Sequence, residues 1–559
     1  MAVDVIVVGG GLAGLVATCE LVGAGHTVAL VDQESRANLG GQAYWSLGGI
    51  FLVDSPQQRR LGIHDSVDIA WQDYAGSAGW DRLHGPHPQD EWAVRWGRAF
   101  VEFAAGEARV WLREQGVAFA PLVGWAERGD GTATGHGNSV PRFHLAWGSG
   151  TGISEPFAGR VREAATAGLV SFFFRHRVDD LLVEGGRVVG VAGTRLAPDG
   201  APRGRASNRR PAGLFELRAP AVVLATGGIG ANHPLIRANW PRRLGTPPGT
   251  MVTGVPAYVD GRMLAIAERA GARVVNRDRM WHYTEGLENW DPIWPGHGIR
   301  VLPGPSPVWL DALGRRLPPP GYPGFDTLGT LRILRGTPEL QPFDHSWFVL
   351  THRIIRKEFA LSGSEQNPDL TTRDRRLLLR RFVGRDAPGP VEAFLRHGAD
   401  FVVADSLDQL VRGMNALTPE PLLEAREVRH QIEARDLEIR NPFTKDAQVM
   451  GIRNARRYLA DRLTRVATPH RVLDPAAGPL IGVRLHILTR KTLGGIQTDL
   501  EGRVLRQDGV PLSGLYAAGE VAGFGGGGAQ GYNALEGTFL LGCMFTGRAA
   551  GRSLVEALR

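Results

Sequence analysis

The chain has 559 residues, of which 43% are hydrophobic and 22% charged, so its composition is that of a globular protein and excludes a disordered or fibrous chain. The formal net charge is +7, but 57 acidic residues are interleaved with 64 basic ones, and we therefore expect no nucleic-acid partner. Glycine occupies 75 positions, well above its usual share of about 7%, and this excess needs a structural explanation.

The first predicted elements form a strand–helix–strand unit. Residues 4–8 predict a short buried strand that is rich in valine, and a helix that runs to Val22 follows it. A second strand is predicted over residues 27–31 and ends at Asp32. Between the first strand and the helix, residues 9–14 contain the pattern GxGxxG. This unit is typical of dinucleotide-binding proteins.

The spacing of the three glycines has a physical reason. Gly9 permits the tight exit from the strand, and Gly11 lets the backbone approach a pyrophosphate at the start of the helix. Gly14 allows the helix to pack closely on the strand. Asp32 follows Gly9 by 23 positions, close to the spacing of about 20 expected for an acid that binds a ribose. We therefore predict a bound dinucleotide.

Three later segments share the pattern of glycines beside a strand. They are the glycine-bracketed loop 39–49, the strand that ends in Thr-Gly-Gly at residues 222–228 and the strand that ends in Gly-Glu at residues 514–520. None of them is a second GxGxxG unit, so a protein with two dinucleotide sites is not expected. The glycine excess is thus concentrated in segments that can lie against one dinucleotide.

The amino-acid composition changes in the middle of the chain. From about residue 276 to residue 485 it contains four tryptophans within 30 positions, proline clusters such as residues 318–320 and arginine-rich predicted helices. This change predicts a separate domain inserted between two parts of the dinucleotide-binding domain. We expect the first part over residues 1–276, the inserted domain over 277–485 and the C-terminal return over 486–559.

Cysteine content and hydropathy indicate in which compartment the protein is expected. The two cysteines, Cys19 and Cys543, cannot build a disulfide framework, and the absence of CxxC and HExxH motifs predicts no metal site. No stretch approaches about 18 uninterrupted apolar residues, so no transmembrane segment is expected. Asp4 stands where a signal peptide would have a basic residue. We therefore expect a cytoplasmic protein.

The ordered series of motifs resembles the fumarate reductase/succinate dehydrogenase flavoprotein superfamily, and within it the 3-ketosteroid dehydrogenase-like branch. The resemblance covers nearly the whole chain. It implies an α/β fold with a discontinuous Rossmann-type (glutathione reductase-like) FAD-binding domain and an inserted α+β capping domain. It also implies FAD as the cofactor. Some family members attach FAD to a histidine in the loop that corresponds to residues 38–50, and because this loop has no histidine we expect non-covalent FAD.

The resemblance also implies which residues hold FAD. Asp32 would bind the adenosine ribose, Val178 would meet the adenine and Glu520 would bind the ribityl chain. The loop glycines and Ser46 would lie along the flavin, and Thr226 would pass near the pyrophosphate. The full expected set is Gly9, Gly11, Leu12, Ala13, Gly14, Asp32, Gly40, Gly41, Ser46, Gly48, Gly49, Val178, Thr226, Gly227, Gly519, Glu520 and Leu535.

The substrate branch depends on the polar residues that face the flavin. Fumarate reductases bind a dicarboxylate with an arginine whose position Ala534 occupies here, and Lys491 replaces one of their histidines. Ketosteroid dehydrogenases hold the keto oxygen with a tyrosine and a glycine amide, two donors that act as an oxyanion hole and stabilise developing negative charge. Gly537 matches that amide. Tyr532 lies one residue from the tyrosine position, so it is either the second donor or a packed loop residue.

Three further residues are candidates for catalysis. Tyr283 lies in a polar and aromatic run at the start of the inserted domain, and Tyr322 follows the kind of stretch after which the family commonly places its acid or base. Either tyrosine could abstract the proton, and for each the alternative is ordinary packing in the capping domain. Lys491 could be desolvated beside the flavin, which lowers the pKa of a lysine, or could stabilise the reduced flavin.

The function expected from these residues is that of an FAD-dependent dehydrogenase acting on CH–CH bonds. It would oxidise a bulky apolar ketone, plausibly a 3-ketosteroid, and pass the electrons to an unknown acceptor. Two alternatives stay open. One is a flavin-dependent reductase of an unsaturated acid, similar to fumarate reductase, and the other is a flavin-binding protein without catalytic activity.

Overall fold

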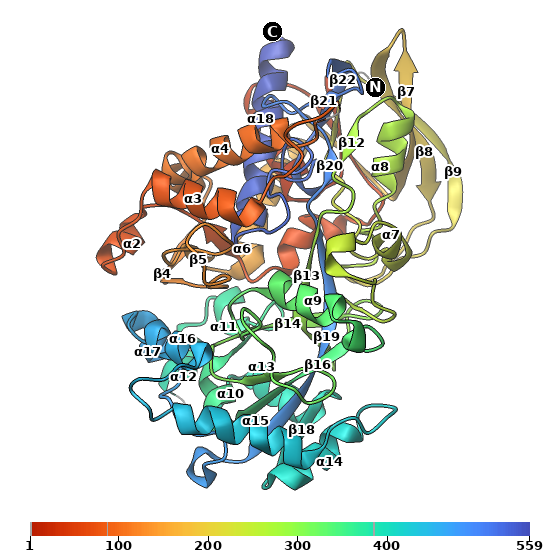
Figure 1. The fold of residues 1–559 in the computed structure, drawn as a ribbon. Coiled ribbons are helices and arrows are strands. Elements are labelled where there is room, and N and C mark those ends of the chain that lie inside the picture. Colours follow the sequence, from red (N-terminus) through yellow and green to blue (C-terminus); the bar gives the residue numbers. More distant parts are fainter. Residues whose placement is uncertain (1–2, 87, 384–385) are drawn as a thin grey trace.

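A six-stranded sheet organises the upper part of the molecule in Figure 1. The structure is a computed structural model that describes residues 3–86, 88–383 and 386–559. The strands of this sheet are parallel except β21, which is antiparallel to its neighbour. Their spatial order is β21 (Arg503–Leu505), β22 (Pro511–Ala517), β10 (Ala221–Leu224), β1 (Val5–Val8), β2 (Val28–Asp32) and β6 (Val170–Phe174). Strands from residues 5–224 and from residues 503–517 therefore meet in one sheet.

Both faces of this sheet are covered, which explains the continuous apolar sequences of its central strands. Along β1, Val5 and Val7 pack toward one hydrophobic cluster, whereas Ile6 and Val8 pack toward another. The first cluster includes helices α1 (Leu12–Gly23), α6 (Ser149–Thr166) and α18 (Thr538–Ala557). The second includes helix α8 (Arg262–Arg269) and the three-stranded sheet β7 (His176–Glu184), β8 (Arg187–Leu196) and β9 (Pro211–Arg218).

A second large sheet forms the lower part of the molecule (Figure 1). Its path is β15 (Val308–Leu310), β16 (His345–Thr351), β19 (Leu480–Thr492), β13 (Met280–Glu288), β14 (Gly298–Pro303) and β17 (Phe359–Leu361), with β11 (Val252–Thr253) and β18 (Phe401–Ala404) also paired to β19. Figure 1 shows β19 rising as one long strand from the lower part into the upper part. The expected boundary at residue 485 falls inside this strand.

Helices surround the lower sheet. They are α9 (Thr327–Gly336), α10 (His352–Glu358), α11 (Pro368–Thr371), α12 (Arg375–Val383), α13 (Gly389–His397), α14 (Leu407–Asn415), α15 (Ala425–Glu438), α16 (Ala447–Ala455) and α17 (Leu459–Thr464). Several begin with a side-chain cap: Asp326 accepts the Gly329 N–H at 2.7 Å at the start of α9. This cap fixes Asp326 at the junction between the two parts of the molecule.

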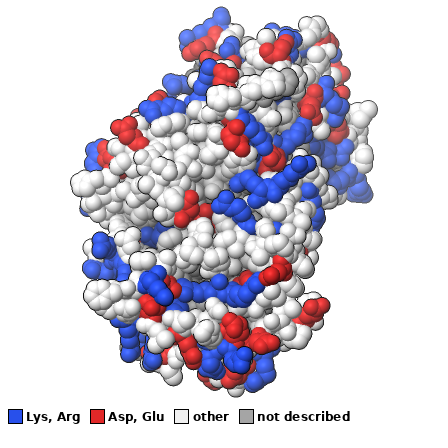
Figure 2. All heavy atoms as spheres, in the orientation of Figure 1, with Lys and Arg blue, Asp and Glu red and all other residues white. Residues whose placement is uncertain are grey.

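The remaining elements complete the upper part. They are α2 (Pro56–Arg60), α3 (Val67–Ala78), α4 (Glu91–Ala105), α5 (Ala108–Glu114) and α7 (His233–Ala238), the sheet of β3 (Gly49–Phe51), β5 (Phe143–Ala146) and β4 (Phe119–Gly124), and the pair β12 (Val274–Val275) and β20 (Gly495–Ile496). Figure 2 shows acidic and basic side chains next to one another over the visible face. Among the described residues, no helix is long and apolar enough to cross a membrane.

Candidate functional site

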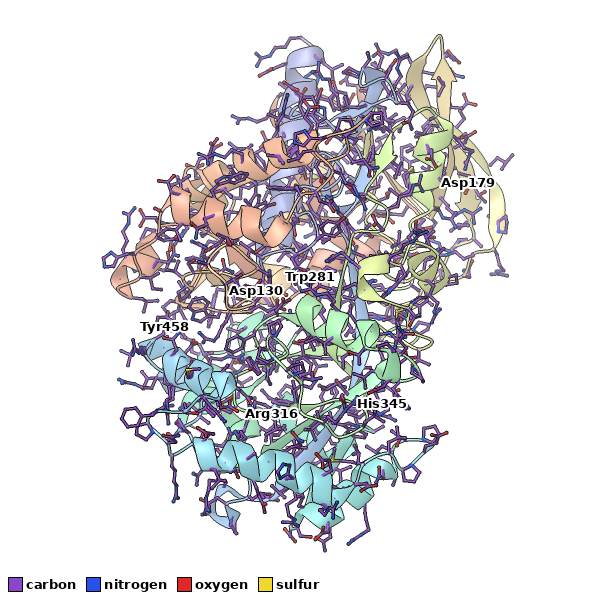
Figure 3. All side chains as sticks on the ribbon, in the orientation of Figure 1. Asp130, Asp179, Trp281, Arg316, His345 and Tyr458 are labelled. Carbon is purple, nitrogen blue, oxygen red and sulfur yellow. The ribbon has the colours of Figure 1, made fainter. Side chains whose placement is uncertain are left out.

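A deep cleft runs from the carboxyl ends of β1 and β2 to the second sheet. At one end it is lined by Asp32 and by the glycine-rich start of α1, and at the other by residues of β13 and β14. Figure 3 places Trp281 of β13 in the middle of the molecule, where the upper and lower parts meet. The carboxyl edge of a parallel sheet is the usual place for a ligand in open α/β folds.

The start of α1 forms an open cradle in this cleft. Gly9 has a φ of +106°, and a β-carbon there would lie 2.4 Å from the carbonyl oxygen of Ala225, so only glycine fits. Gly11 has an ordinary φ of −76°, and a β-carbon there would meet nothing closer than 3.9 Å. The space before the helix is therefore open to a ligand. Because the N-terminus of a helix attracts anions, the cradle fits a pyrophosphate.

Asp32 closes the same end of the cleft. Its carboxylate accepts hydrogen bonds from the N–H groups of Gly10 and Glu34, both at 2.8 Å. Burial raises the pKa of Asp32 to about 6, and the two backbone hydrogen bonds oppose that rise. The two N–H donors fix the carboxylate at the end of β2, where it can accept further hydrogen bonds from ribose hydroxyl groups.

The side chains of Gln42, Lys491 and Glu520 form a hydrogen-bonded group in the lining of the cleft. Gln42 donates from Nε2 to Glu520 at 2.8 Å, and Lys491 donates to the amide oxygen of Gln42 at 2.8 Å. Lys491 Nζ also lies 3.6 Å from Glu520 Oε2. Burial lowers the pKa of Lys491, and the charge of Glu520 opposes that fall. Lys491 and Glu520, which are distant in sequence, thus meet at Gln42, in the loop 39–49 that the sequence assigned to the flavin.

Two buried polar atoms in the cleft indicate a missing partner. Thr226 Oγ1 and Gln33 Oε1 have no hydrogen-bond partner among the described residues, and both residues line the cleft. Buried polar groups are nearly always hydrogen-bonded in folded proteins. Together with the open cradle at Gly11, these atoms fit a polar ligand as long as FAD.

The structure brings most of the predicted cofactor residues together in this one cleft. Those that line it are Gly9, Gly11, Leu12, Ala13, Asp32, Gly41, Ser46, Gly48, Gly49, Val178, Thr226, Gly227, Gly519 and Glu520. The other three lie behind its wall. A β-carbon on Gly14 would lie 2.1 Å from the Gly9 carbonyl oxygen, Gly40 donates its N–H to the Gly10 carbonyl at 2.8 Å, and Leu535 is buried.

Tyr283 lies at the end of the cleft that the second sheet forms. Its hydroxyl donates to Glu536 Oε1 at 3.0 Å, and the Arg300 guanidinium lies 3.7 Å above its ring. Arg300 also forms an ion pair with Glu536. Burial raises the pKa of Tyr283 far above its ordinary value, and the negative charge of Glu536 adds to that rise. A free tyrosinate is thereby disfavoured, and Glu536 is the carboxylate that accepts the Tyr283 hydroxyl proton in the hydrogen bond.

Gly537 reaches the same part of the cleft. It has a φ of +91° and precedes α18, and its carbonyl oxygen accepts the Phe51 N–H at 3.0 Å. Among the described residues, its own N–H has no hydrogen-bond partner. Gly537 lines the cleft, so its N–H at the start of a 20-residue helix is available to a carbonyl oxygen there.

Apolar side chains surround these polar groups. The lining includes Phe143, Leu302, Phe524, Phe539 and Leu540. An apolar wall with a few convergent polar groups is the usual composition of a small-molecule site.

Two predicted catalytic residues do not line the cleft. The Tyr532 hydroxyl donates to Asp81 at 3.0 Å, and the Arg243 and Arg279 guanidinium groups lie 3.9 Å and 4.3 Å from the ring centroid. Tyr322 packs against Phe325, with 5.7 Å between the ring centroids. The other three candidates, Gly537, Tyr283 and Lys491, all line the cleft.

Arg300 and Glu536 are the functional candidates that the sequence did not single out. They are 236 positions apart in the chain, and they meet because β14 and the loop before α18 lie on either side of Tyr283. Arg300 lies in no motif. Glu536 lies in the segment 530–537 that matches a family motif, between Leu535, which the resemblance implies holds FAD, and Gly537, which it implies binds the keto oxygen, but the resemblance gives Glu536 itself no role.

Known proteins resemble this chain along its whole length. A family model described as FAD binding domain matches residues 4–540. A KsdD-like steroid dehydrogenase of Mycobacterium tuberculosis is 59% identical over 556 residues, which cover 100% of this chain and 96% of the relative. A KsdD-like steroid dehydrogenase of Mycolicibacterium smegmatis is 60% identical over 537 residues, 96% of each chain.

A solved structure supports the fold. The 3-ketosteroid delta1-dehydrogenase of Sterolibacterium denitrificans superposes with a TM-score of 0.66 and covers 100% of both chains at 16% identity. At that identity the likeness establishes the mixed α/β fold and no more.

Proposed function

Because this chain belongs to the FAD-binding domain family, we propose that it is an FAD-dependent dehydrogenase that introduces a C=C double bond next to the ketone of a steroid-like, apolar substrate. The single observation that carries the proposal is the pairing of Tyr283 with Glu536 at the end of an apolar cleft whose other end fits a dinucleotide. The names of relatives that share about 60% of their residues with this chain favour a steroid as the substrate.

We further propose that the chain forms two domains with different roles. The FAD-binding domain, of the Rossmann type, comprises residues 1–276 and 486–559, because every strand of the six-stranded sheet lies in these ranges. The capping domain comprises residues 277–485 and carries Tyr283 and Arg300 over the cleft. The substrate would bind between the two domains.

The chain's own residues supply the proton chemistry. FAD bound in the cleft would supply the acceptor for the hydride that leaves the oxidised substrate carbon. Tyr283 takes the proton from the neighbouring carbon while its own hydroxyl proton passes to Glu536, so one C–H bond breaks at each carbon and a C=C bond forms between them. The Gly537 N–H binds the keto oxygen and stabilises the negative charge that develops there. Lys491 places a positive charge beside the expected flavin position.

Arg300, the arginine beside Tyr283, does not favour a carboxylate substrate. Arg300 already forms ion pairs with Glu536 and Glu127, so its guanidinium is neutralised by the protein. A dicarboxylate needs an arginine that is free to bind it. Next to Tyr283 the cleft therefore suits an apolar ketone better than an unsaturated acid.

Turnover with two matched steroids tests this function. The FAD-loaded protein should convert a 3-ketosteroid, in the presence of an artificial electron acceptor, into a product with two hydrogens fewer. The corresponding 3-hydroxysteroid, which has no carbonyl for Gly537 to bind, should not react. Equal turnover of both steroids would contradict the assigned role of the ketone.

Glu536→Gln should slow flavin reduction by about tenfold to a hundredfold, because glutamine can accept the Tyr283 hydrogen bond but cannot take the proton. Anaerobic stopped-flow absorbance measures the rate, and the FAD content of the purified variant should be unchanged. An unaltered rate would remove Glu536 from the proton transfer.

Acid precipitation should release the flavin into the supernatant, because no histidine lies in residues 38–50 to form a covalent bond. The measurement is the flavin absorbance of the supernatant and of the redissolved pellet. Flavin that stays with the polypeptide would show a covalent bond to another residue.

A further inference from the structure

A group of buried ionisable side chains lies directly behind Tyr283. We call it the buried charge cluster and define it as Glu127, His136, Glu285, Arg300, Asp326 and Glu536. All except Glu536 are at most 5% exposed. They come from β13, β14, the start of α9, the loop before α18 and the segment between β4 and β5. The proposed proton transfer uses Glu536 alone, so neither it nor the cofactor site explains the three other carboxyl groups.

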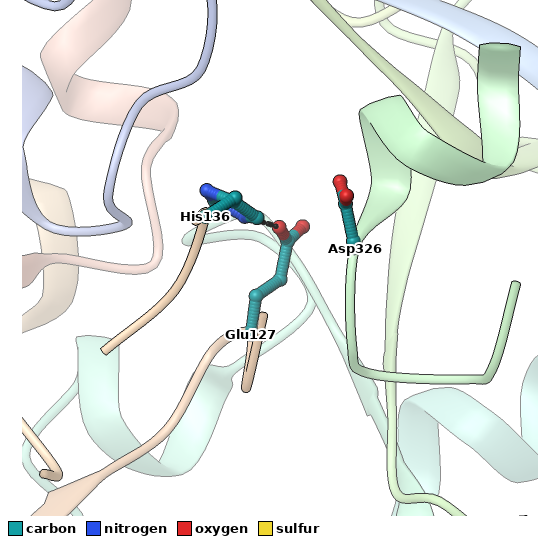
Figure 4. Close-up of side chains that lie close together, drawn as sticks. All are labelled: Glu127, His136 and Asp326. Atoms are coloured by element: carbon teal, nitrogen blue, oxygen red, sulfur yellow. Dashed lines mark hydrogen bonds and ion pairs between the residues drawn. The ribbon is translucent and has the colours of Figure 1, made fainter. Parts of the chain in front are cut away.

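Arg300 is the centre of this cluster. Its two terminal nitrogens contact Glu536 and Glu127, and its Nε lies 3.9 Å from Glu285 Oε2. The other oxygen of Glu127 faces His136 Nε2 at 3.1 Å, as Figure 4 shows. Glu536, which binds the Tyr283 hydroxyl, therefore shares one guanidinium with two further carboxyl groups.

The charges of the cluster do not balance if every group is ionised. Four carboxyl groups face two cations, Arg300 and His136. Burial opposes the charge on His136, but its hydrogen bond to Glu127 and the charge of Asp326 raise its pKa above the ordinary value. Excess negative charge is costly in a buried site, so protons or a cation must compensate it.

Protons are the better explanation of the two. Glu127, His136 and Asp326 bring potential ligand atoms within 4.8 Å of one another, a spacing that a metal ion could use. However, each oxygen of Glu127 already faces a donor, from Arg300 or from His136. Figure 4 shows Asp326 opposite this pair, and its Oδ1 accepts the Gly329 N–H. Donors of the protein thus satisfy both oxygens of Glu127 and one oxygen of Asp326 without a metal ion.

Glu285 is only weakly compensated by Arg300. Its close partner is the Thr327 hydroxyl, which donates at 2.7 Å, whereas Arg300 gives its terminal nitrogens to the other carboxylates. Burial raises the pKa of Glu285 to about 7; the charge of Arg300 opposes the rise and that of Glu127 adds to it. Burial also raises the pKa of Asp326. Burial therefore favours the protonated form of Glu285.

We propose that Glu285 is a positioning residue whose protonation state sets how strongly Glu536 attracts the proton of Tyr283. This inference rests on the proposed dehydrogenase function. When Glu285 is protonated, Arg300 is shared by two carboxylates, those of Glu536 and Glu127. When Glu285 loses its proton, a third carboxylate faces Arg300, and repulsion among the carboxylates favours transfer of the Tyr283 proton to Glu536. Proton abstraction through Tyr283 should therefore become faster as the pH rises through neutrality.

The pH profile of flavin reduction tests this role. In the FAD-loaded wild type, the rate with a 3-ketosteroid should rise roughly threefold to tenfold between about pH 5.5 and about pH 9. Glu285→Gln, which is permanently neutral, should keep the low rate at every pH. Glu358→Gln is the matched control, because Glu358 is also fully buried with a raised pKa but hydrogen-bonds Ser306 away from the cleft. A rise in Glu285→Gln as large as in the wild type would overturn the proposal.

Infrared spectroscopy gives a readout that needs no substrate. The difference spectrum between the oxidised wild type and Glu285→Gln should show the C=O band of one protonated carboxylic acid, and this band should disappear near pH 7. Absence of this band, or a stoichiometric divalent metal ion in the purified protein, would overturn the inference while leaving the dehydrogenase function intact. A titrating band in a protein whose flavin no ketosteroid reduces would overturn the dehydrogenase function, and with it the role of Glu285 in that reaction.

Discussion

Replacing Tyr283 with phenylalanine should slow the reduction of flavin by the substrate by about 10²-fold to 10⁴-fold, the usual contribution of a positioned acid or base. Phenylalanine keeps the packing against Arg300 but removes the hydroxyl that binds Glu536 at 3.0 Å. No other described residue of the cleft donates a hydroxyl to that carboxylate. Stopped-flow mixing under anaerobic conditions measures the rate.

Tyr532→Phe is the matched control for this prediction. The Tyr532 hydroxyl binds Asp81 outside the cleft, so its removal should change the rate less than about twofold. Both variants should contain as much FAD as the wild type. A large loss of rate in Tyr532→Phe with little loss in Tyr283→Phe would reverse the assignment and restore Tyr532 as the catalytic tyrosine.

Gly11→Asp should abolish FAD binding without unfolding the protein. The φ of Gly11 is −76°, and a β-carbon would meet nothing closer than 3.9 Å, so the chain has room for the new side chain. The added carboxylate would occupy the cradle at the start of α1 and repel a pyrophosphate. Because like charges in contact cost several kcal/mol, the affinity for FAD should fall at least a hundredfold. Fluorescence titration of the apoprotein with FAD measures this change.

Gly23→Asp places the same substitution at the other end of α1. A β-carbon there would meet nothing within 4 Å, and the residue does not line the cleft. This variant should bind FAD like the wild type, and both variants should show the wild-type circular dichroism spectrum. A Gly11→Asp variant that stays yellow would place the pyrophosphate elsewhere.

The cofactor half of the site is predictable from the sequence because its signals are local. Gly9, Gly11, Gly14 and Asp32 lie within one strand–helix–strand unit, and their spacing reflects contacts inside that unit. The structure forms it with β1, α1 and β2 adjacent, and the strand ends meet at one cleft. The other glycine segments required the family resemblance, which implied that they belong to one discontinuous FAD-binding domain.

The reaction half of the site is less predictable because tertiary contacts decide it. Tyr532 lies one residue from the family's tyrosine position, but its N–H donates to the Ala78 carbonyl at 2.7 Å, and this contact holds the loop against the end of α3. The tyrosine therefore turns toward Asp81. Tyr283 faces Glu536 because β13 lies beside the loop before α18, and no spacing in the sequence records that neighbourhood.

The most direct test of the proposed dehydrogenase function is anaerobic mixing of the FAD-loaded protein with a 3-ketosteroid and, separately, with succinate. The ketosteroid should bleach the yellow flavin absorbance and lose two hydrogens, whereas succinate should leave the spectrum unchanged. Bleaching by succinate alone would contradict the account and place the protein among the enzymes of unsaturated acids.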